Sequence, residues 1–180
     1  YATGGGGPAR EKWPDMAPAP VLDFMERTWV YDTETWLERV GERPWTLTHM
    51  DYEFDNMAFT GDGPVVFDWQ TPLRSYPGGD LAWFLGLGAT DESVAEEDAL
   101  LDTYLAAFTA AGGPAWSRDD LVTDMCASLQ FHCTGAATTL NSIVDGGAPP
   151  EDRSRRRFEK MLAGMMDAAV RWQLLDRIEE

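Results

Sequence analysis

The stretch that decides the fold is residues 45–70, WTLTHMDYEFDNMAFTGDGPVVFDWQ. Its second half predicts a β-hairpin, because the segments 57–60 and 65–67 flank the turn sequence Gly61-Asp62-Gly63. Its first half, residues 49–56, places one of the chain's two histidines among three acidic residues and an asparagine. Apolar side chains lie between these polar groups, and we expect four of them to anchor the segment: Tyr52, Phe54, Met57 and Phe59.

The sequence on both sides of this stretch has a helical pattern, because apolar residues recur at spacings of three and four. Ser117, with Asp120 three residues later, predicts a capped helix N-terminus. The predicted helical segments are 21–40 (one helix or two short ones), 92–111, 117–144, and 151–175. The fold class is therefore α+β, mainly helical, with one small hairpin.

The length of 180 residues suits one domain, and residues 1–20 have the composition of an irregular linker, with four consecutive glycines and four prolines. We assign residues 21–180 to the folded unit. The formal net charge of −17 argues against a nucleic-acid partner, since such binding needs clustered Lys and Arg.

The remaining bulk features concern membranes and redox state. No run approaches the roughly 18 apolar residues of a membrane span, so no membrane partner is expected. Cys126 and Cys133 lie seven apart on one predicted helix, about 10 Å along its axis, which is too far for a disulfide. We expect buried, reduced thiols and a cytoplasmic location.

The hairpin predicts a pair of oxygen ligands. Asn56 and Asp68 are each six positions from Asp62, so a turn centred on Asp62 would place them opposite one another. An amide oxygen beside a carboxylate suits Mg²⁺, which takes few protein ligands and completes its shell with water and phosphate oxygens. The alternative is structural: Asn56 caps a turn and Asp68 forms an ion pair.

Asp51 favours the metal interpretation. It lies five residues before Asn56, where a carboxylate can accept the proton of an attacking hydroxyl beside the metal. The spacing His49-x-Asp51-x4-Asn56, followed by a carboxylate after the next strand, is that of a kinase catalytic loop.

Three blocks, HMDYEFDNMAF, VVFDWQ and GGDLAWFL, together resemble the aminoglycoside phosphotransferase family and its choline-kinase-like and ecdysteroid-kinase-like relatives. The resemblance implies the carboxy-terminal lobe of a protein-kinase-like fold, with ATP as co-substrate and Mg²⁺ as cofactor. It implies that Asp51 is the catalytic base and that Asn56 and Asp68 bind the metal and the nucleotide phosphates. It also implies structural support from His49 and from Asp80.

The role of Asp80 has two interpretations. The resemblance implies that its carboxylate braces the catalytic loop, whereas its position alone would make it the N-cap of the segment 81–85. Met50 departs from the family, which usually has glycine there; if the position requires a positive φ, Met50 is strained by roughly 1–2 kcal/mol.

The resemblance also implies a domain plan. The catalytic loop and metal hairpin occupy residues 45–86, substrate-side helices occupy 91–180, and an amino-terminal nucleotide lobe with a glycine-rich loop and a lysine is absent from the sequence. We expect the substrate pocket to be lined by the helices that begin near Ser117 and Glu151, and the acidic, aromatic composition to suit a cationic or hydroxyl-bearing small molecule.

Three functions follow from these residues. The first is a small-molecule kinase that transfers the γ-phosphoryl group of ATP to a hydroxyl, with its nucleotide lobe elsewhere in a longer protein. The second is a non-catalytic acidic helical binding module or degenerate lobe. The third is a metal-dependent hydrolase, which is weaker because the second imidazole, His132, lies on a distant helix where packing is the usual role. The basic run 153–157 could hold an anionic substrate or partner, but we expect it to form a solvated face that pairs with acidic surface groups.

Overall fold

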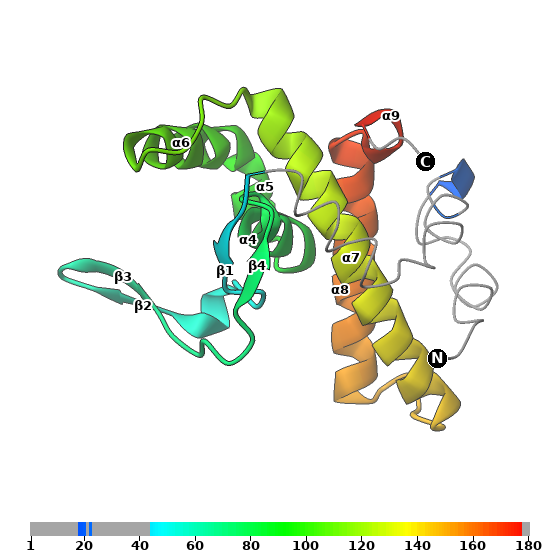
Figure 1. The fold of residues 1–180 in the computed structure, drawn as a ribbon. Coiled ribbons are helices and arrows are strands. Elements are labelled where there is room, and N and C mark those ends of the chain that lie inside the picture. The colour runs from blue at the N-terminus through cyan, green and yellow to red at the C-terminus, as the bar shows by residue number, and fades with distance from the viewer. Residues whose placement is uncertain (1–17, 21, 23–43, 178–180) are drawn as a thin grey trace.

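The computed structural model of the chain describes residues 18–20, 22 and 44–177, and these form a mainly helical α+β structure (Figure 1). The predicted helical segment 21–40 and most of the irregular segment 1–20 lie outside the described residues. The described elements from residue 44 onward are, in order, β1 (Thr46–Thr48), the 3-10 turn η1 (Phe54–Asn56), β2 (Met57–Thr60), β3 (Gly63–Val66), β4 (Leu73–Ser75), α4 (Gly79–Ala82), the π-helix η2 (Trp83–Leu87), α5 (Asp91–Ala95), α6 (Glu97–Ala110), α7 (Arg118–Asp145), α8 (Arg153–Arg171) and α9 (Leu174–Arg177).

The predicted hairpin is confirmed as β2–β3, which projects away from the helices (Figure 1). Its register pairs Met57 with Val66 and Thr60 with Gly63, so the turn has two residues instead of three. The predicted opposition of Asn56 and Asp68 is therefore wrong by one position. Asn56 lies opposite Phe67, whose amide donates to the Asn56 carbonyl at 3.0 Å.

A second sheet, β1–β4, was not predicted from the sequence. It is antiparallel, with Thr46 opposite Ser75 and Thr48 opposite Leu73. Each strand has only three residues, which is too short for a period of two to stand out, and the partners are far apart in the sequence. Because Thr48 pairs with Leu73, this sheet brings together the two ends of segment 49–72, which contains the loop and the hairpin.

The predicted helix over residues 92–111 is two helices, α5 and α6, interrupted at Glu96. A capping box between Thr90 and Ser93 starts α5. At the start of α6 the Glu97 carboxylate accepts from the Trp172 indole at 2.8 Å and pairs with Arg171, both from the end of α8. These contacts at the start of α6 join residues about 75 positions apart. The local periodicity of apolar residues therefore cannot predict them.

The two long helices follow the sequence more closely. The predicted capping box is confirmed, since Ser117 and Asp120 exchange both of its hydrogen bonds at the start of α7. The last predicted helix is α8, but it ends at Arg171 and Gln173 adopts a left-handed φ of 54° before α9. The Trp172 carbonyl at this break accepts from the Arg177 guanidinium at 2.7 Å.

The core lies where α7 packs against α8, with η2 against both of them and α4 against α7 and η2. Two glycines permit the close approach. A Cβ at Gly78 would lie 2.9 Å from the Met125 backbone nitrogen of α7, and a Cβ at Gly164 would lie 2.5 Å from the carbonyl oxygen of Gly86.

The cysteine prediction is confirmed, because both cysteines are on α7 and are free, buried thiols whose pKa burial raises. Among the described helices, none combines the length and the apolar character that crossing a bilayer would take.

Candidate active site

The backbone of residues 49–50 is held by one carboxylate from α4. Asp80 accepts from the His49 amide with both oxygens, each at 2.9 Å, and from the Met50 amide at 3.0 Å. Burial raises the pKa of Asp80, while the hydrogen bonds from these two amides lower it. Gly78 is the N-cap of α4, without a side-chain hydrogen bond, so the N-cap interpretation of Asp80 is wrong.

Met50 has a φ of 68°, the left-handed region that glycine adopts without penalty. The position where the resembling family has glycine therefore does require a positive φ in this chain. An L-residue there costs roughly 1–2 kcal/mol, and the hydrogen bond from its amide to Asp80 helps to hold it.

His49 connects the loop to the strand that precedes Asp68. Its side chain is fully buried, and its Nε2 lies 2.8 Å from the Phe67 carbonyl oxygen. Because a carbonyl only accepts, Nε2 carries the proton and donates. The Trp69 ring packs edge-on against the imidazole with centroids 4.7 Å apart. Through these contacts the buried His49 side chain links the start of the loop to residues 67 and 69.

Asp51 and Asn56 are joined across the four residues between them. The Asn56 amide nitrogen donates to the Asp51 carbonyl at 2.7 Å and to Asp51 Oδ2 at 2.9 Å. Asn56 is only 8% exposed, whereas Asp51 is half-buried and faces a pocket. With its nitrogen directed to Asp51, Asn56 retains its Oδ1 as an acceptor.

Asp68 is exposed and also has a left-handed φ, 64°. Both backbone groups of the preceding Phe67 are bonded, to Asn56 and to His49, so the chain is fixed up to Asp68. Because its backbone leaves the extended conformation, strand alternation no longer determines the direction of its side chain.

The two proposed metal ligands offer a carboxylate and an amide oxygen, a donor set that fits Mg²⁺. Within residues 44–177 and the few described before them, no group of three or more His, Cys, Asp or Glu side chains is arranged to hold a metal ion. A cation held by Asn56 and Asp68 would therefore take further ligands from outside this pair, such as water or phosphate oxygens.

Aromatic contacts anchor the loop on the π-helix. The rings of Tyr52 and Phe54 lie edge-on to Phe84, at centroid distances of 6.0 and 4.9 Å. Met57 packs against the core, as predicted. The prediction for Phe59 is wrong: it is 70% exposed, because it lies further out than Met57 on the hairpin that projects from the helices.

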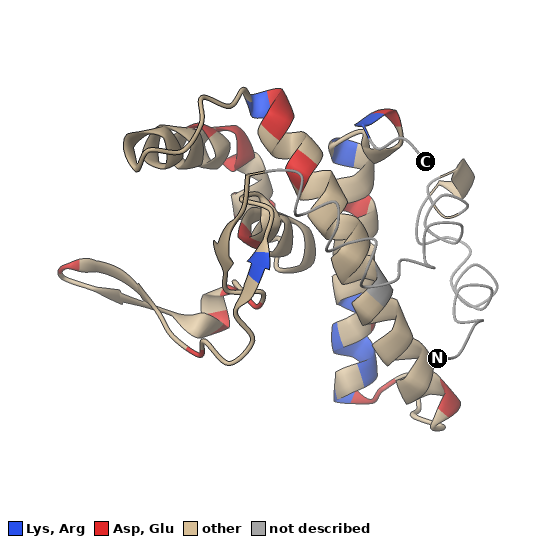
Figure 2. Cartoon of the chain, in the orientation of Figure 1, with Lys and Arg blue, Asp and Glu red and all other residues tan. Residues whose placement is uncertain are grey.

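Two arginines of the basic run at the start of α8, which is blue in Figure 2, pair with acidic groups, as expected. Arg157 bonds Glu53 at 2.9 Å and Arg155 bonds Glu159 at 2.9 Å. The Arg157 pair connects α8 to the loop across 104 positions of sequence. Burial raises the pKa of Glu53, against the lowering effect of Arg157.

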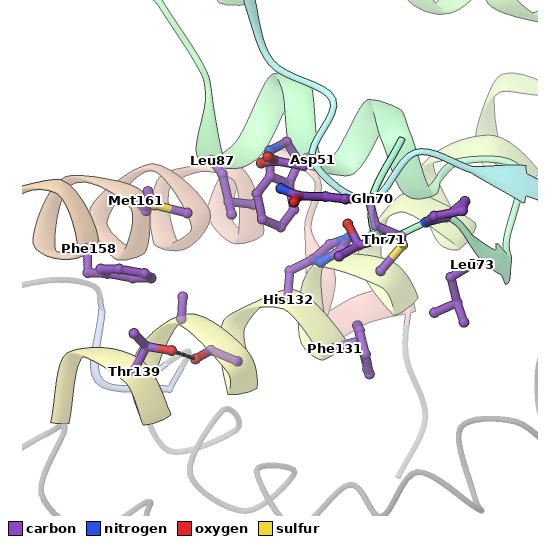
Figure 3. Close-up of a pocket in the computed structure, with 15 residues that line it drawn as sticks. Asp51, Gln70, Thr71, Leu73, Leu87, Phe131, His132, Thr139, Phe158 and Met161 are labelled. Carbon is purple, nitrogen blue, oxygen red and sulfur yellow. Dashed lines mark hydrogen bonds between the residues drawn. The ribbon is translucent and has the colours of Figure 1, made fainter. Parts of the chain in front are cut away.

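A pocket of about 740 Å³ opens beside Asp51, among η2, α7 and α8 (Figure 3). The helices that begin near Ser117 and Glu151, α7 and α8, both line this pocket, and its use by the substrate stays a prediction. The contributions of the 70–73 segment and of η2 were not predicted, although Gln70 and Trp83 lie in the blocks that carry the family resemblance. The described lining residues are Met50, Asp51, Gln70, Thr71, Pro72, Leu73, Trp83, Leu87, Phe131, His132, Gly135, Ala136, Thr139, Phe158 and Met161.

The π-helix contributes two of these residues, Trp83 and Leu87, which are its first and last positions. His132 packs edge-on against Trp83 with centroids 4.9 Å apart. Burial lowers the pKa of His132 to about 4, partly offset by a backbone hydrogen bond with Gly79, so this imidazole is neutral at neutral pH.

Residues 8–121, well over half of the chain, match the model of the APH phosphotransferase enzyme family. The chain belongs to this family. Comparisons with curated proteins and with solved structures gave no match.

The APH match covers the loop, the hairpin, Asp80 and the helices up to the first turn of α7. The pocket residues contributed by α7 and α8, from Phe131 to Met161, lie beyond the matched range. Family membership therefore rests on a range that contains the loop, the hairpin and Asp80. It does not indicate what binds to the pocket wall formed by α7 and α8.

Proposed function

We propose that this APH-family chain carries the catalytic loop of an ATP-dependent kinase that phosphorylates a hydroxyl group of a small molecule. Asp51 would act as the base: it takes the hydroxyl proton while the acceptor oxygen forms a bond to the γ-phosphorus. The bond from that phosphorus to the β–γ bridging oxygen breaks, and ADP leaves.

One observation carries the proposal, namely the position of Asp51 at the pocket. Its Oδ2 is oriented by the Asn56 amide at 2.9 Å, and the loop backbone on its amino-terminal side is held by Asp80. A base has to be held at hydrogen-bonding distance from the substrate proton. The loop meets this requirement through bonds made by buried or half-buried groups.

Asn56 and Asp68 are the proposed ligands for Mg²⁺, which when bound neutralises charge on the transferring phosphoryl group. The nucleotide-binding segment is proposed to lie outside the described residues, because residues 44–177 contain only two two-stranded sheets.

The test uses the complete gene product that contains this chain. Asp51→Ala should lower phosphoryl transfer from ATP by at least about 100-fold while preserving Mg²⁺-dependent ATP binding in calorimetry. Asp68→Ala should weaken that binding. Asp62→Ala, at the exposed hairpin turn, is the matched control and should change neither.

Unchanged turnover in both Asp51→Ala and Asp68→Ala would overturn the proposal. Absence of ATP binding by the complete product would instead favour a non-catalytic helical module.

A further inference from the structure

The charge of the pocket differs from that of the whole chain. The chain has 31 acidic and 14 basic residues. Yet among the described residues that line the pocket, Asp51 is the only acidic one, and none is Lys or Arg. His132 is neutral at neutral pH because burial lowers its pKa to about 4. The described wall therefore has a single charged group.

Five of the large apolar side chains come from three separate elements. Trp83 and Leu87 come from η2, Phe131 from α7, and Phe158 and Met161 from α8. Figure 3 shows Phe158 and Met161 along the pocket from Asp51. A molecule that fills this space would contact apolar and aromatic groups over most of its surface.

Polar groups are few and are found mainly at one end. Gln70 lies beside Asp51 in Figure 3, and Thr71 follows it in the sequence. Thr139 lies further along α7, and its hydroxyl donates to the Gly135 carbonyl at 2.9 Å. Polar recognition is thus concentrated where a substrate hydroxyl would meet Asp51.

This distribution discriminates between kinds of acceptor. A molecule with several ammonium groups would meet one carboxylate and bury its other charges without partners, which is unfavourable. An uncharged, largely apolar alcohol would lose water mainly from apolar surface, which is favourable, and would keep its one hydroxyl beside Asp51. We propose that the acceptor is an uncharged, largely apolar alcohol whose body lies between α7 and α8 and whose hydroxyl lies at Asp51; this identification of the acceptor rests on the proposed kinase function.

Gly135 offers a way to block the pocket without disturbing the fold. It is an exposed residue of α7 that lines the pocket, and a Cβ added there meets no described atom within 4 Å. Leucine also favours helix more than glycine does. Thr138 is exposed on the same helix and is not among the pocket residues, so Thr138→Leu is the matched control.

The experiment measures binding to the full chain by calorimetry without nucleotide, so it does not depend on phosphoryl transfer. The probes are 2-naphthaleneethanol, an uncharged fused-ring alcohol, and 2-deoxystreptamine, a cyclitol with two amino groups. We expect the alcohol to bind at least about 10-fold more tightly. Gly135→Leu should weaken its binding at least about 10-fold with no loss of thermal stability, and Thr138→Leu should leave it within about 2-fold.

Asp51→Asn separates the two kinds of ligand. Binding of the alcohol should change less than about 3-fold, since most of its contacts are apolar. Tighter binding of 2-deoxystreptamine that is lost in Asp51→Asn would overturn the inference, and so would alcohol binding that Gly135→Leu leaves unchanged or the absence of alcohol binding. If the alcohol binds as expected but the complete gene product transfers no phosphoryl group, the kinase proposal fails and the apolar binding site remains.

Discussion

The loop 49–56 and the hairpin 57–66 are adjacent in sequence but are stabilised in different ways. The loop depends on distant partners: Asp80 accepts its amides from 30 and 31 positions away, and Phe84 receives its aromatic rings. The hairpin depends on its own pairing, from Met57 with Val66 to Thr60 with Gly63. The loop is thus positioned by tertiary structure and the hairpin by local sequence.

Exposure follows the same division. His49 is fully buried and Asn56 nearly so, whereas Phe59 and Val65 are 70% and 50% exposed. Groups that must keep a fixed geometry lie at the base, where packing and buried hydrogen bonds restrict them. Changes in the loop should therefore be costly, and equivalent changes in the hairpin should be tolerated.

The largest effect is expected for Asp80→Ala, which leaves the amides of His49 and Met50 without their acceptor. Hydrogen bonds to a charged group are worth about 1.5–3 kcal/mol each, so the free energy of unfolding should fall by roughly 3 kcal/mol. Urea denaturation measures this. Asp62→Ala in the hairpin turn is the control and should cost under about 0.5 kcal/mol; equal losses in the two variants would contradict the comparison.

A smaller effect of opposite sign is expected for Met50→Gly. Relief of the left-handed strain should exceed the entropy cost of glycine and raise the free energy of unfolding by up to about 1 kcal/mol. The control is Met57→Gly, where φ is −126° and no strain exists, so stability should fall. Denaturant melts of both variants would decide it, and a loss in Met50→Gly as large as in Met57→Gly would show that the loop stores no strain.

The next prediction concerns pH and Asp80. Because burial raises its pKa in the folded state above the ordinary 3.8, the folded chain binds this proton more tightly. The resulting stabilisation is fully present below pH 3.8 and is lost as pH rises through the folded pKa. The free energy of unfolding of the wild type should therefore rise relative to that of Asp80→Asn as pH falls from 7 to 4. Urea denaturation measures this difference, and Asp62→Asn is the reference for removing one negative charge. A wild-type advantage over Asp80→Asn that grows as pH rises toward 7 would contradict the prediction.

The smallest effect is expected for Phe59→Ser on the exposed hairpin, where little apolar surface is buried. Its free energy of unfolding should change by less than about 0.5 kcal/mol in a thermal or urea melt. Tyr52→Ser, in the loop, should cost about 2 kcal/mol because its ring packs on Phe84. Equal losses at the two positions would mean that the hairpin is also held by tertiary contacts.

Predictions from the sequence succeeded where the signal is local. The hairpin, the capping box of Ser117 and Asp120 and the buried cysteines all rest on residues close in the chain, and all are confirmed. The family resemblance is confirmed as well. The metal and base assignments of Asp51, Asn56 and Asp68 stay predictions.

Predictions failed where the structure depends on contacts between distant residues or on a shift of one residue in the strand pairing. The turn uses two residues instead of three, which moves Asn56 opposite Phe67. The β1–β4 sheet pairs short strands that have no visible period. The break before α6 accompanies the contacts of Glu97 with Arg171 and Trp172, which lie about 75 positions away.

The sequence by itself determined the two long helices α7 and α8, the hairpin and the set of polar residues in the loop, because these depend on spacing and on turn chemistry within a few residues. Only the tertiary structure decided that Asp80 holds the loop backbone, that Met50 is strained, and that an acidic chain has a nearly neutral pocket. The physical reason is that a side chain's role depends on which partners come within hydrogen-bonding or packing distance. For residues such as Asp80 and His132, those partners come from elements far away in the chain.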